Sequence, residues 1–225
     1  MPDAALNVFV QARMSSSRFP GKVLAPFKGR PIIDHVLDAA ATALGADATI
    51  LVTSTETSDD PLAVYAASTG RNVFRGPLDD VFGRFLACLE QNPCDWIMRL
   101  CADSPLLDPG LLRQAAKTAL ENPDADLVTN TFPRSFPHGQ SVEVLRADTF
   151  RGLDPAALND NDREHVTPFF YRNPERFRIV NIECPERFAG LDTVFTVDTL
   201  DDLIRLNGMD GPPAFFGRPQ GGTAA

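Results

Sequence analysis

The stretch Asn7-Val-Phe-Val-Gln-Ala-Arg-Met-Ser-Ser-Ser-Arg-Phe-Pro-Gly-Lys22 decides how the rest of the chain is interpreted. It begins with a short apolar run, residues 8–10, that is typical of a buried β-strand. The run leads into a loop of small and hydroxyl side chains that carries three cations, Arg13, Arg18 and Lys22. A basic loop directly after a buried strand predicts a binding site for a small anionic ligand.

The composition favours such a small ligand over a polymer. The chain has 225 residues, a formal net charge of −9 and 44% hydrophobic residues. This length suits a single domain with a sizeable core. A general nucleic-acid surface would need a basic stripe, which an acidic chain of this kind does not offer. We therefore expect no nucleic acid polymer among its partners.

The sequence predicts a cytoplasmic protein that does not enter a membrane. No apolar run approaches the roughly 20 residues of a membrane span. The start, Met-Pro-Asp-Ala-Ala, lacks the cationic and apolar regions of a signal peptide. The four cysteines form no C-x-x-C pair and no zinc-like spacing. We therefore expect them to be reduced thiols.

In the first part of the chain, short apolar strands alternate with helices. We predict strands at residues 8–10, 49–52, 72–74, 95–100 and 126–129, and helices at 31–44, 59–70, 79–90 and 108–121. This alternation is the pattern of a parallel, doubly wound sheet flanked by helices.

The second part of the chain departs from this rhythm. We predict strands at 141–145, 177–182 and 194–197, a helix over 160–171 and a last helix after residue 198. We interpret roughly residues 131–192 as a small inserted lobe within a single domain that spans residues 1–209. The Pro- and Gly-containing residues 210–225 are expected to form a disordered tail.

The ends of the predicted strands carry most of the polar side chains that could do chemistry. In open α/β sheets, ligands lie outside the carboxyl ends of the strands. The side chains found there are Gln11, Arg13, Thr53, Ser54, Arg75, Asp103 and Asp198. Two carboxylates from separate strands favour a Mg²⁺ site, because Mg²⁺ prefers one or two carboxylates plus phosphate oxygens. Asp103 has a second interpretation as a helix cap or turn former, since Ser104-Pro105 follows it.

The basic loop does not match the common phosphate-binding motifs. Ser16 stands where a Walker A loop needs its first glycine, and Val23 follows Lys22 in place of Ser or Thr. No G-x-G-x-x-G occurs, which disfavours a dinucleotide oxidoreductase. The loop is therefore a phosphate loop of a different kind.

Residues 11–24 resemble the opening motif of the cytidylyltransferase family that includes the CMP-sugar synthetases. Within that family they are most similar to the branch named for spore-coat polysaccharide biosynthesis protein F. The resemblance continues, in the same order, through Thr53-Ser-Thr, Phe74-Arg-Gly, Asp79-Asp-Val81 with Arg84, Arg99-Leu-Cys-Ala-Asp-Ser-Pro-Leu-Leu-Asp-Pro109, Arg163-Glu-His-Val-Thr-Pro168 and Thr196-Val-Asp-Thr-Leu-Asp-Asp-Leu203. It covers nearly the whole chain before the tail.

This resemblance implies a Rossmann-like, glycosyltransferase-A-type nucleotidyltransferase fold that binds CTP and Mg²⁺. It implies that Arg13, Lys22 and Asp103 are catalytic and that Asp103 and Asp198 bind the metal. The implied nucleotide-binding residues are Gln11, Ala12, Arg13, Met14, Ser15, Ser16, Ser17, Arg18, Lys22, Thr53, Ser54, Arg75, Asp80, Arg84 and Asp103.

The second substrate, a sugar-like acceptor, is assigned to His138, Glu143, Arg163 and His165. Arg163 and His165 would suit an acidic or phosphorylated sugar. They could also belong to a solvated helix face with local ion pairs of little energetic value.

The chain departs from its relatives at two places. Ser15 stands where this branch commonly has Gly, and a positive φ there would be costly for serine. His138-Gly139 replaces a common Asp-Gly.

The sequence therefore predicts a Mg²⁺-dependent cytidylyltransferase that transfers CMP from CTP to a sugar-like acceptor and releases pyrophosphate. Surface polysaccharide or flagellar glycan synthesis is the expected setting, and the family implies a homodimer. One alternative is a glycosyltransferase that uses a nucleotide sugar. Asp160-Asn161-Asp162 spells D-x-D, although at a predicted helix start and not at a strand end. The other alternative is a non-catalytic nucleotide-binding protein.

Overall fold

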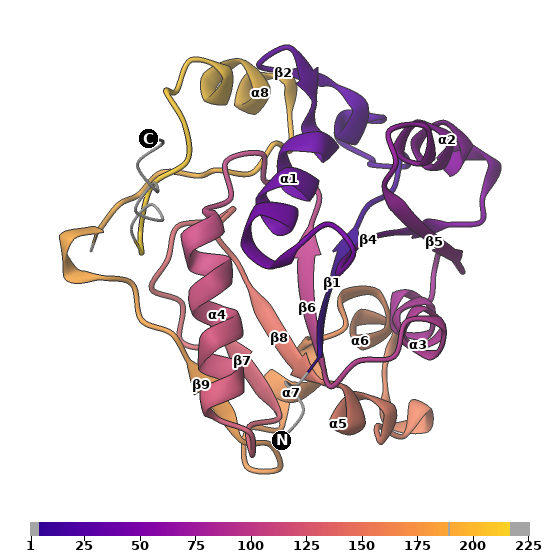
Figure 1. The fold of residues 1–225 in the computed structure, drawn as a ribbon, viewed down its shortest axis with the longest axis vertical. Coiled ribbons are helices and arrows are strands. Elements are labelled where there is room, and N and C mark those ends of the chain that lie inside the picture. Colours follow the sequence, from indigo (N-terminus) through magenta and orange to yellow (C-terminus); the bar gives the residue numbers. More distant parts are fainter. Residues whose placement is uncertain (1–4, 189, 217–225) are drawn as a thin grey trace, which may run out of the picture.

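A seven-stranded sheet forms the centre of the molecule (Figure 1). The computed structural model describes residues 5–188 and 190–216. In sheet order the strands are β5 (Asn72–Gly76), β4 (Thr49–Ser54), β1 (Leu6–Gln11), β6 (Trp96–Cys101), β8 (Glu143–Arg146), β7 (Leu127–Thr129) and β9 (Ile179–Asn181). Neighbouring strands are parallel except that β8 runs antiparallel to β6 and β7. The predicted α/β fold with a mostly parallel sheet is confirmed.

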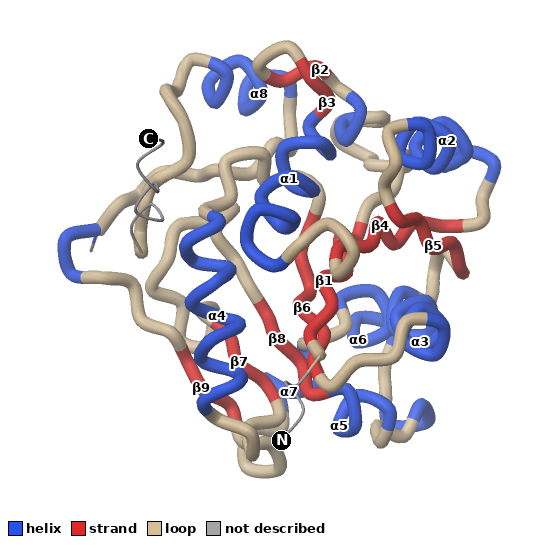
Figure 2. The backbone as a smooth tube through the Cα atoms, viewed as in Figure 1, coloured by secondary structure: helices blue, strands red, loops and turns tan. Residues whose placement is uncertain are grey.

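Helices cover both faces of the sheet because the strand side chains alternate between two apolar clusters (Figures 1 and 2). Val8 and Val10 of β1 belong to the cluster that includes α1 (Ile32–Leu44) and α4 (Pro109–Glu121). Phe9, between them, points to the other face and packs edge-on against Phe85 of α3, with ring centroids 5.4 Å apart. The helices on that second face are α3 (Val81–Gln91), α5 (Ala147–Arg151) and α7 (Pro168–Arg172).

The remaining elements are short. They are α2 (Asp60–Ser68), α6 (Asp160–His165), α8 (Leu200–Asn207), the strands β2 (Pro26–Phe27) and β3 (Arg30–Pro31), and the 3₁₀ turns Lys22–Leu24, Thr57–Asp59, Pro155–Ala157 and Glu186–Phe188. The sequence predicted no strand where β2 and β3 form a hairpin. Its turn residues, Lys28 and Gly29, both have positive φ, as a tight two-residue hairpin turn requires.

Two predicted elements in the second part of the chain are wrong. Residues 194–197 form no strand. Phe195 N donates to His138 O (2.7 Å) and Val197 N donates to Asp103 O (2.8 Å), so the backbone of this segment bonds to two loops and not to a neighbouring strand. The single helix predicted over 160–171 is two helices, α6 and α7. Val166 between them has a φ of 71°, and Pro168 has no N–H with which to continue a helical ladder.

The segment that we interpreted as an inserted lobe is joined closely to the sheet. It supplies β8, which lies between β6 and β7, and β9 at the sheet edge. Its boundaries near residues 131 and 192 stay a prediction.

The tail prediction is wrong for residues 210–216, which pack onto the domain. Phe215 is fully buried, its ring lies 5.1 Å from that of Phe136, and its backbone N donates to Asp108 Oδ2 (2.8 Å). Burial of a large aromatic side chain outweighs the turn-forming composition of the segment. Residues 217–225 of the expected tail lie outside the described residues.

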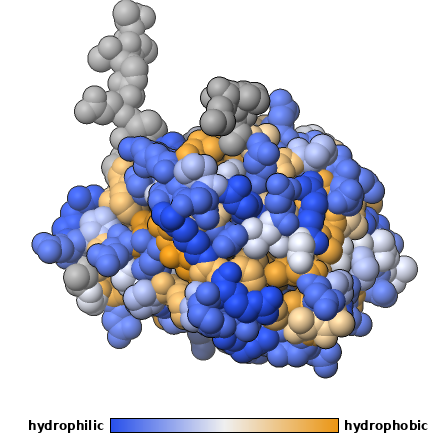
Figure 3. Space-filling model, turned by 90° about the horizontal axis from the view of Figure 1, so that it is seen from below, coloured by the Kyte–Doolittle hydropathy of each residue, from blue (hydrophilic) through white to orange (hydrophobic). Residues whose placement is uncertain are grey.

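Viewed from below Figure 1, the surface shows strips of apolar residues between hydrophilic ones (Figure 3). In the described part of the chain, no helix is long and apolar enough to cross a membrane. All four cysteines have free thiols.

Candidate active site

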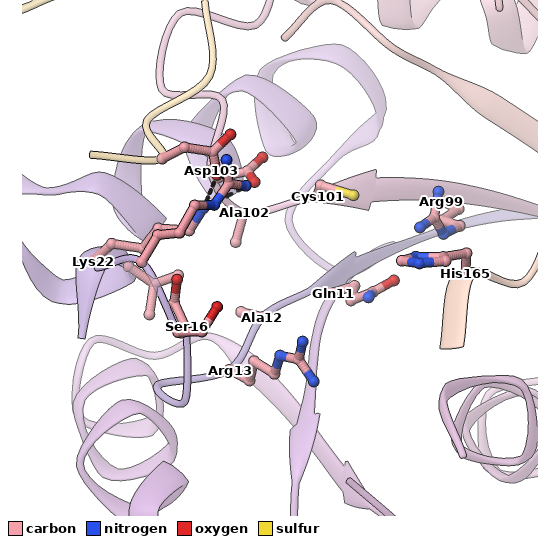
Figure 4. A pocket seen from close by; sticks show the side chains of 14 residues that line it. Gln11, Ala12, Arg13, Ser16, Lys22, Arg99, Cys101, Ala102, Asp103 and His165 are labelled. Atoms are coloured by element: carbon pink, nitrogen blue, oxygen red, sulfur yellow. Dashed lines mark hydrogen bonds and ion pairs between the residues drawn. The ribbon is translucent and has the colours of Figure 1, made fainter. Parts of the chain in front are cut away.

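A pocket of about 290 Å³ opens at the carboxyl ends of β1 and β6 (Figure 4). Its lining residues are Gln11, Ala12, Arg13, Ser16, Ser17, Arg18, Lys22, Val23, Arg99, Cys101, Ala102, Asp103, His165 and Asp198. The structure thus brings together eight of the predicted nucleotide-binding residues and both predicted metal ligands.

The ionic centre of this pocket is the Lys22 cluster, which we define as Lys22, Asp103, Asp198 and Arg18. Lys22 Nζ donates to Asp103 Oδ2 (3.1 Å), Asp198 Oδ1 (2.9 Å) and Val197 O (2.8 Å). Arg18 also contacts Asp198 Oδ1, at 2.9 Å. The two carboxylates converge from distant parts of the chain because Val197 N bonds the backbone oxygen of Asp103.

The carboxylates of the two aspartates lie close together on either side of Lys22 Nζ. The two Lys22 distances add to 6.0 Å, which is the largest separation the two carboxylate oxygens can have. The described residues contain no cluster of three or more His, Cys, Asp or Glu side chains that could hold a metal. A pair of carboxylates facing a basic pocket nevertheless fits Mg²⁺, which takes its other ligands from phosphate and water. Helix α4 is capped by Asp108, which accepts from Gly110 N (2.8 Å), and not by Asp103.

The backbone of the basic loop is organised around Met14. Met14 O accepts from Ser16 N (3.0 Å) and Gly21 N (2.8 Å), and Met14 N donates to Asp59 Oδ1 (2.7 Å). Ala12 N donates to Val52 O (3.3 Å). Three N–H groups in residues 12–18 are therefore already occupied.

This occupancy restricts which loop residues can bind a phosphate. Of residues 12–18, the N–H groups of Arg13, Ser15, Ser17 and Arg18 have no acceptor in the described part of the chain. The N–H groups of Ala12, Met14 and Ser16 are therefore not available to a phosphate, although Ala12 and Ser16 line the pocket.

Ser15 takes an ordinary backbone conformation. Apart from glycines, only Lys28 and Val166 of the described residues have positive φ. Replacement of the family's glycine by serine therefore brings no backbone strain at this position. Gly21, with φ of 73°, is the loop residue that needs glycine.

Thr53 and Ser54 do not reach the pocket, contrary to expectation. Both are fully buried, and both donate to Asp59 Oδ2. Asp59 was predicted only as the start of a helix, and its contact with the basic loop was not foreseen. The available signal was an aspartate a few residues after the Thr53-Ser54 strand end.

Arg75, Asp80 and Arg84 also lie outside the pocket lining. Arg75 Nε donates to Ser54 O (2.7 Å), and Asp80 accepts from Gly83 N (2.9 Å) as the cap of α3. Arg84 is 1% exposed and donates to Pro77 O (2.7 Å); burial lowers the pKa of its guanidinium to about 10. These three side chains support loops and do not face the ligand space.

A second pocket, of about 190 Å³, adjoins the first and shares Arg99, Cys101 and Asp103 with it. Its other lining residues are Ser104, Leu107, His138, Gly139, Ser141, Glu143 and Thr196. Arg99 Nη1 donates to Glu143 Oε2 at 2.5 Å. Arg99 was not predicted as a site residue. A single cation within an otherwise apolar strand was the feature of the sequence that pointed to it.

The pair of Arg99 and Glu143 is buried and fixed by further bonds. Glu143 Oε1 also accepts from Thr167 Oγ1 (2.7 Å) and Tyr171 Oη (2.6 Å). Burial and the nearby Glu143 raise the pKa of Tyr171. Burial raises the pKa of the Cys101 thiol and so favours its neutral form.

The four predicted acceptor residues are divided between different places. His138 and Glu143 line the second pocket, whereas His165 lines the first, where Figure 4 shows it near Gln11 and Arg99. Arg163 lines neither; it donates to Pro155 O (2.7 Å), and its Nη1 lies 3.8 Å from Asp80 Oδ1.

The residues that form the basic loop and both pockets lie within a segment that matches a known family. The family model described as Cytidylyltransferase matches residues 7–201. The chain belongs to the cytidylyltransferase family. It is therefore a nucleotidyltransferase, as the sequence predicted.

Relatives in sequence agree with this assignment. Spore coat polysaccharide biosynthesis protein SpsF of Bacillus subtilis (strain 168) is 32% identical over 205 residues, which cover 89% of this chain and 84% of that protein. A 3-deoxy-manno-octulosonate cytidylyltransferase of Solibacter usitatus is 32% identical over 181 residues, covering 76% of this chain and 69% of that protein.

Solved structures show the same fold. A cytidylyltransferase from Leptospira borgpetersenii superimposes with a TM-score of 0.85 at 29% identity, covering 91% of this chain and 85% of the other. A CMP:2-keto-3-deoxy-manno-octonic acid synthetase complexed with CTP superimposes with a TM-score of 0.70 at 15% identity, covering 91% and 97%.

Proposed function

We propose that this cytidylyltransferase uses CTP and Mg²⁺ to transfer CMP to a sugar-like acceptor for surface polysaccharide or glycan synthesis. The Lys22 cluster is the observation that carries the proposal, because it joins two carboxylates and two cations beside four unoccupied loop N–H groups. A triphosphate with a divalent cation is the ligand whose charges complement such a set.

In this proposal the side chains position the substrates and neutralise phosphate charge, and none of them forms a covalent intermediate. A hydroxyl of the acceptor attacks the α-phosphorus of CTP and gives up its proton to water, the bond from that phosphorus to the bridging oxygen breaks, and pyrophosphate leaves. Lys22, Arg13 and Arg18 offset the negative charge that develops on the phosphates. Asp103 and Asp198 would hold Mg²⁺, which stabilises the same charge when bound.

Arg13 has to exchange its present partner for the phosphates. Its Nη2 lies 3.2 Å from Glu164 Oε1, and both side chains are nearly half exposed. An exposed pair of this kind contributes little energy, so a triphosphate can replace Glu164 as its partner.

The second pocket supplies the acceptor side, because Asp103 lines both pockets and marks where the two substrates meet. The hydroxyls of Ser104, Ser141 and Thr196, with His138, suit a polyhydroxylated ligand. The names of several relatives specify manno-octulosonate acceptors, and a sugar acid of that class is the first acceptor to test. A homodimer remains our expectation from the family.

The proposal is tested by measuring pyrophosphate release from CTP with MgCl₂ and a panel of sugar acids and sugar phosphates. Acceptor-dependent release of pyrophosphate is expected, and Asp103→Asn should reduce it by about a hundredfold. Release of a nucleoside diphosphate from a nucleotide sugar would instead support the glycosyltransferase alternative. Binding of CTP without turnover across the panel would favour the non-catalytic one.

A further inference from the structure

Asp59 lies fully buried beneath the basic loop, outside the pocket lining. Its Oδ1 accepts from Met14 N (2.7 Å). Its Oδ2 accepts from Thr53 Oγ1 and Ser54 N, both at 3.2 Å, and from Ser54 Oγ at 2.5 Å. One carboxylate thus joins the loop after β1 to the end of β4.

A carboxylate is the group that this position requires. Four donors converge on it, and an ionised carboxylate offers acceptor sites only, on two oxygens. An asparagine has one acceptor oxygen, whereas Met14 N and Ser54 N donate to opposite oxygens of the carboxylate. Whichever way the amide turns, its NH₂ group would face one of these two backbone donors, and the negative charge that strengthens both bonds would be lost. Helix α2 follows directly, yet Asp59 makes no side-chain capping bond to it, so helix formation does not explain the residue.

A buried negative charge close to a phosphate loop is unfavourable for an anionic ligand. The four hydrogen bonds that Asp59 accepts offset this cost. Arg84 offsets part of the charge, since Asp59 raises the pKa of this guanidinium against the lowering by burial. Arg84 Nε is buried without a hydrogen-bond partner in the described chain, so Arg84 acts here through charge and not through a direct bond.

We propose that Asp59 is a positioning residue that holds the basic loop in the conformation that binds nucleotide. Thr53 and Ser54 contribute by fixing the carboxylate of Asp59. By holding Met14 N, Asp59 fixes the residue whose carbonyl accepts from Ser16 N and Gly21 N. Those bonds in turn orient the free N–H groups of Ser15 and Ser17 and place Lys22 directly after the Gly21 turn. This inference rests on the proposed nucleotide site, but the anchoring of the loop can be measured without nucleotide.

The test compares Asp59→Asn with Glu56→Gln, a matched control that removes one exposed carboxylate three residues earlier. Hydrogen exchange of the Met14 amide is measured by NMR in the free protein, and CTP affinity by calorimetry with MgCl₂. In Asp59→Asn we expect exchange about tenfold faster and a Kd for CTP about tenfold weaker, the fold-change of one hydrogen bond to a charged group. Glu56→Gln should match the wild type in both.

Unchanged Met14 exchange in folded Asp59→Asn would overturn the anchoring role, and faster exchange with an unchanged Kd for CTP would overturn the positioning role. If Asp59→Asn does not fold, Ser54→Ala removes one of the four donors and should speed Met14 exchange about threefold; no change there would also overturn the proposal. A wild-type protein that does not bind CTP would contradict the proposed function, whereas Met14 exchange would still report on Asp59.

Discussion

The Lys22 cluster and the pair of Arg99 and Glu143 lie in adjoining pockets but are built in opposite ways. Lys22 is as buried as Arg99, at 11% side-chain exposure, but its partners Asp103 and Asp198 retain 26% and 28%, and Arg18 retains 66%. Arg99 and Glu143 retain only 11% and 7%, and Glu143 accepts two further hydroxyl bonds. The first set of ion pairs is open to exchange with a ligand. The second is closed and holds β6 to β8 and α7.

This difference shows that charged side chains near a pocket can either bind a ligand or stabilise the fold. A partly exposed pair loses little when an anion or a metal replaces one partner. A buried pair that loses one partner leaves an uncompensated charge. We therefore expect substitutions in the Lys22 cluster to change activity and substitutions in the buried pair to change stability.

Glu143→Gln should give the largest effect and the sharpest test of the buried pair. The amide that replaces the carboxylate can still bond Thr167 and Tyr171, but Arg99 loses its counter-charge. We expect the free energy of unfolding to fall by about 3–5 kcal/mol, measured by urea denaturation. Glu121→Gln, on the exposed end of α4, is the control and should change it by less than about 0.5 kcal/mol.

The double variant Arg99→Met/Glu143→Met separates pairing from packing. Because it removes both charges together, it should recover a large part of the stability that Glu143→Gln loses. Equal losses in the single and double variants would mean that the pair itself is not what stabilises this region.

Lys22→Met should affect activity more than stability. Loss of this charge from the phosphate site should raise the barrier by about 3 kcal/mol, so that kcat/KM for CTP falls about a hundredfold. Pyrophosphate release measures it. Lys117→Met removes an exposed lysine of α4 and should leave kcat/KM unchanged. Comparable activity in the two variants would show that the Lys22 cluster is not the nucleotide site.

A further carboxylate, Asp162, extends the comparison to the pH dependence of stability. Hydrogen bonds from Arg172 and charge attraction hold the pKa of Asp162 below its ordinary value against the effect of burial. A carboxyl with a lowered folded pKa stabilises the protein above its unfolded pKa and loses this contribution as pH falls. Below about pH 4 the wild type should therefore lose stability more steeply than Asp162→Asn. Parallel curves of unfolding free energy against pH would contradict this.

Ser15→Gly should give the smallest effect. Ser15 does not need a positive φ, so glycine offers the loop no relief of strain. We expect kcat/KM for CTP to stay within about twofold of the wild type and stability within about 0.5 kcal/mol. A gain in activity of tenfold or more would show that the loop geometry does depend on glycine at this position.

The sequence predicted the parallel part of the fold well because each strand and helix there carries its own periodic signal. It failed at residues 194–197 and at Val166, where single bonds to distant loops and one positive φ decide the backbone. Neither feature leaves a periodic pattern. Phe215 was missed for a related reason, since its partners Phe136 and Asp108 lie far away in sequence.

The same distinction holds at the candidate site. Residues at the carboxyl ends of β1 and β6 could be placed from the sequence, because the topology of a parallel sheet brings such ends together. Thr53, Ser54 and Arg84 could not, because their side-chain directions depend on a buried carboxylate and on loop packing. A strand-end rule locates a residue but does not say whether it faces the ligand or supports the loop beneath it.

The central claim is that the Lys22 cluster binds CTP together with Mg²⁺, and calorimetric titration of CTP tests it most directly. CTP is titrated into the wild type in buffer with MgCl₂, into the wild type in buffer with EDTA, and into Asp198→Asn in buffer with MgCl₂. We predict binding by the wild type in MgCl₂ that weakens at least about tenfold in EDTA and in Asp198→Asn. Binding of equal strength in all three titrations would contradict the account.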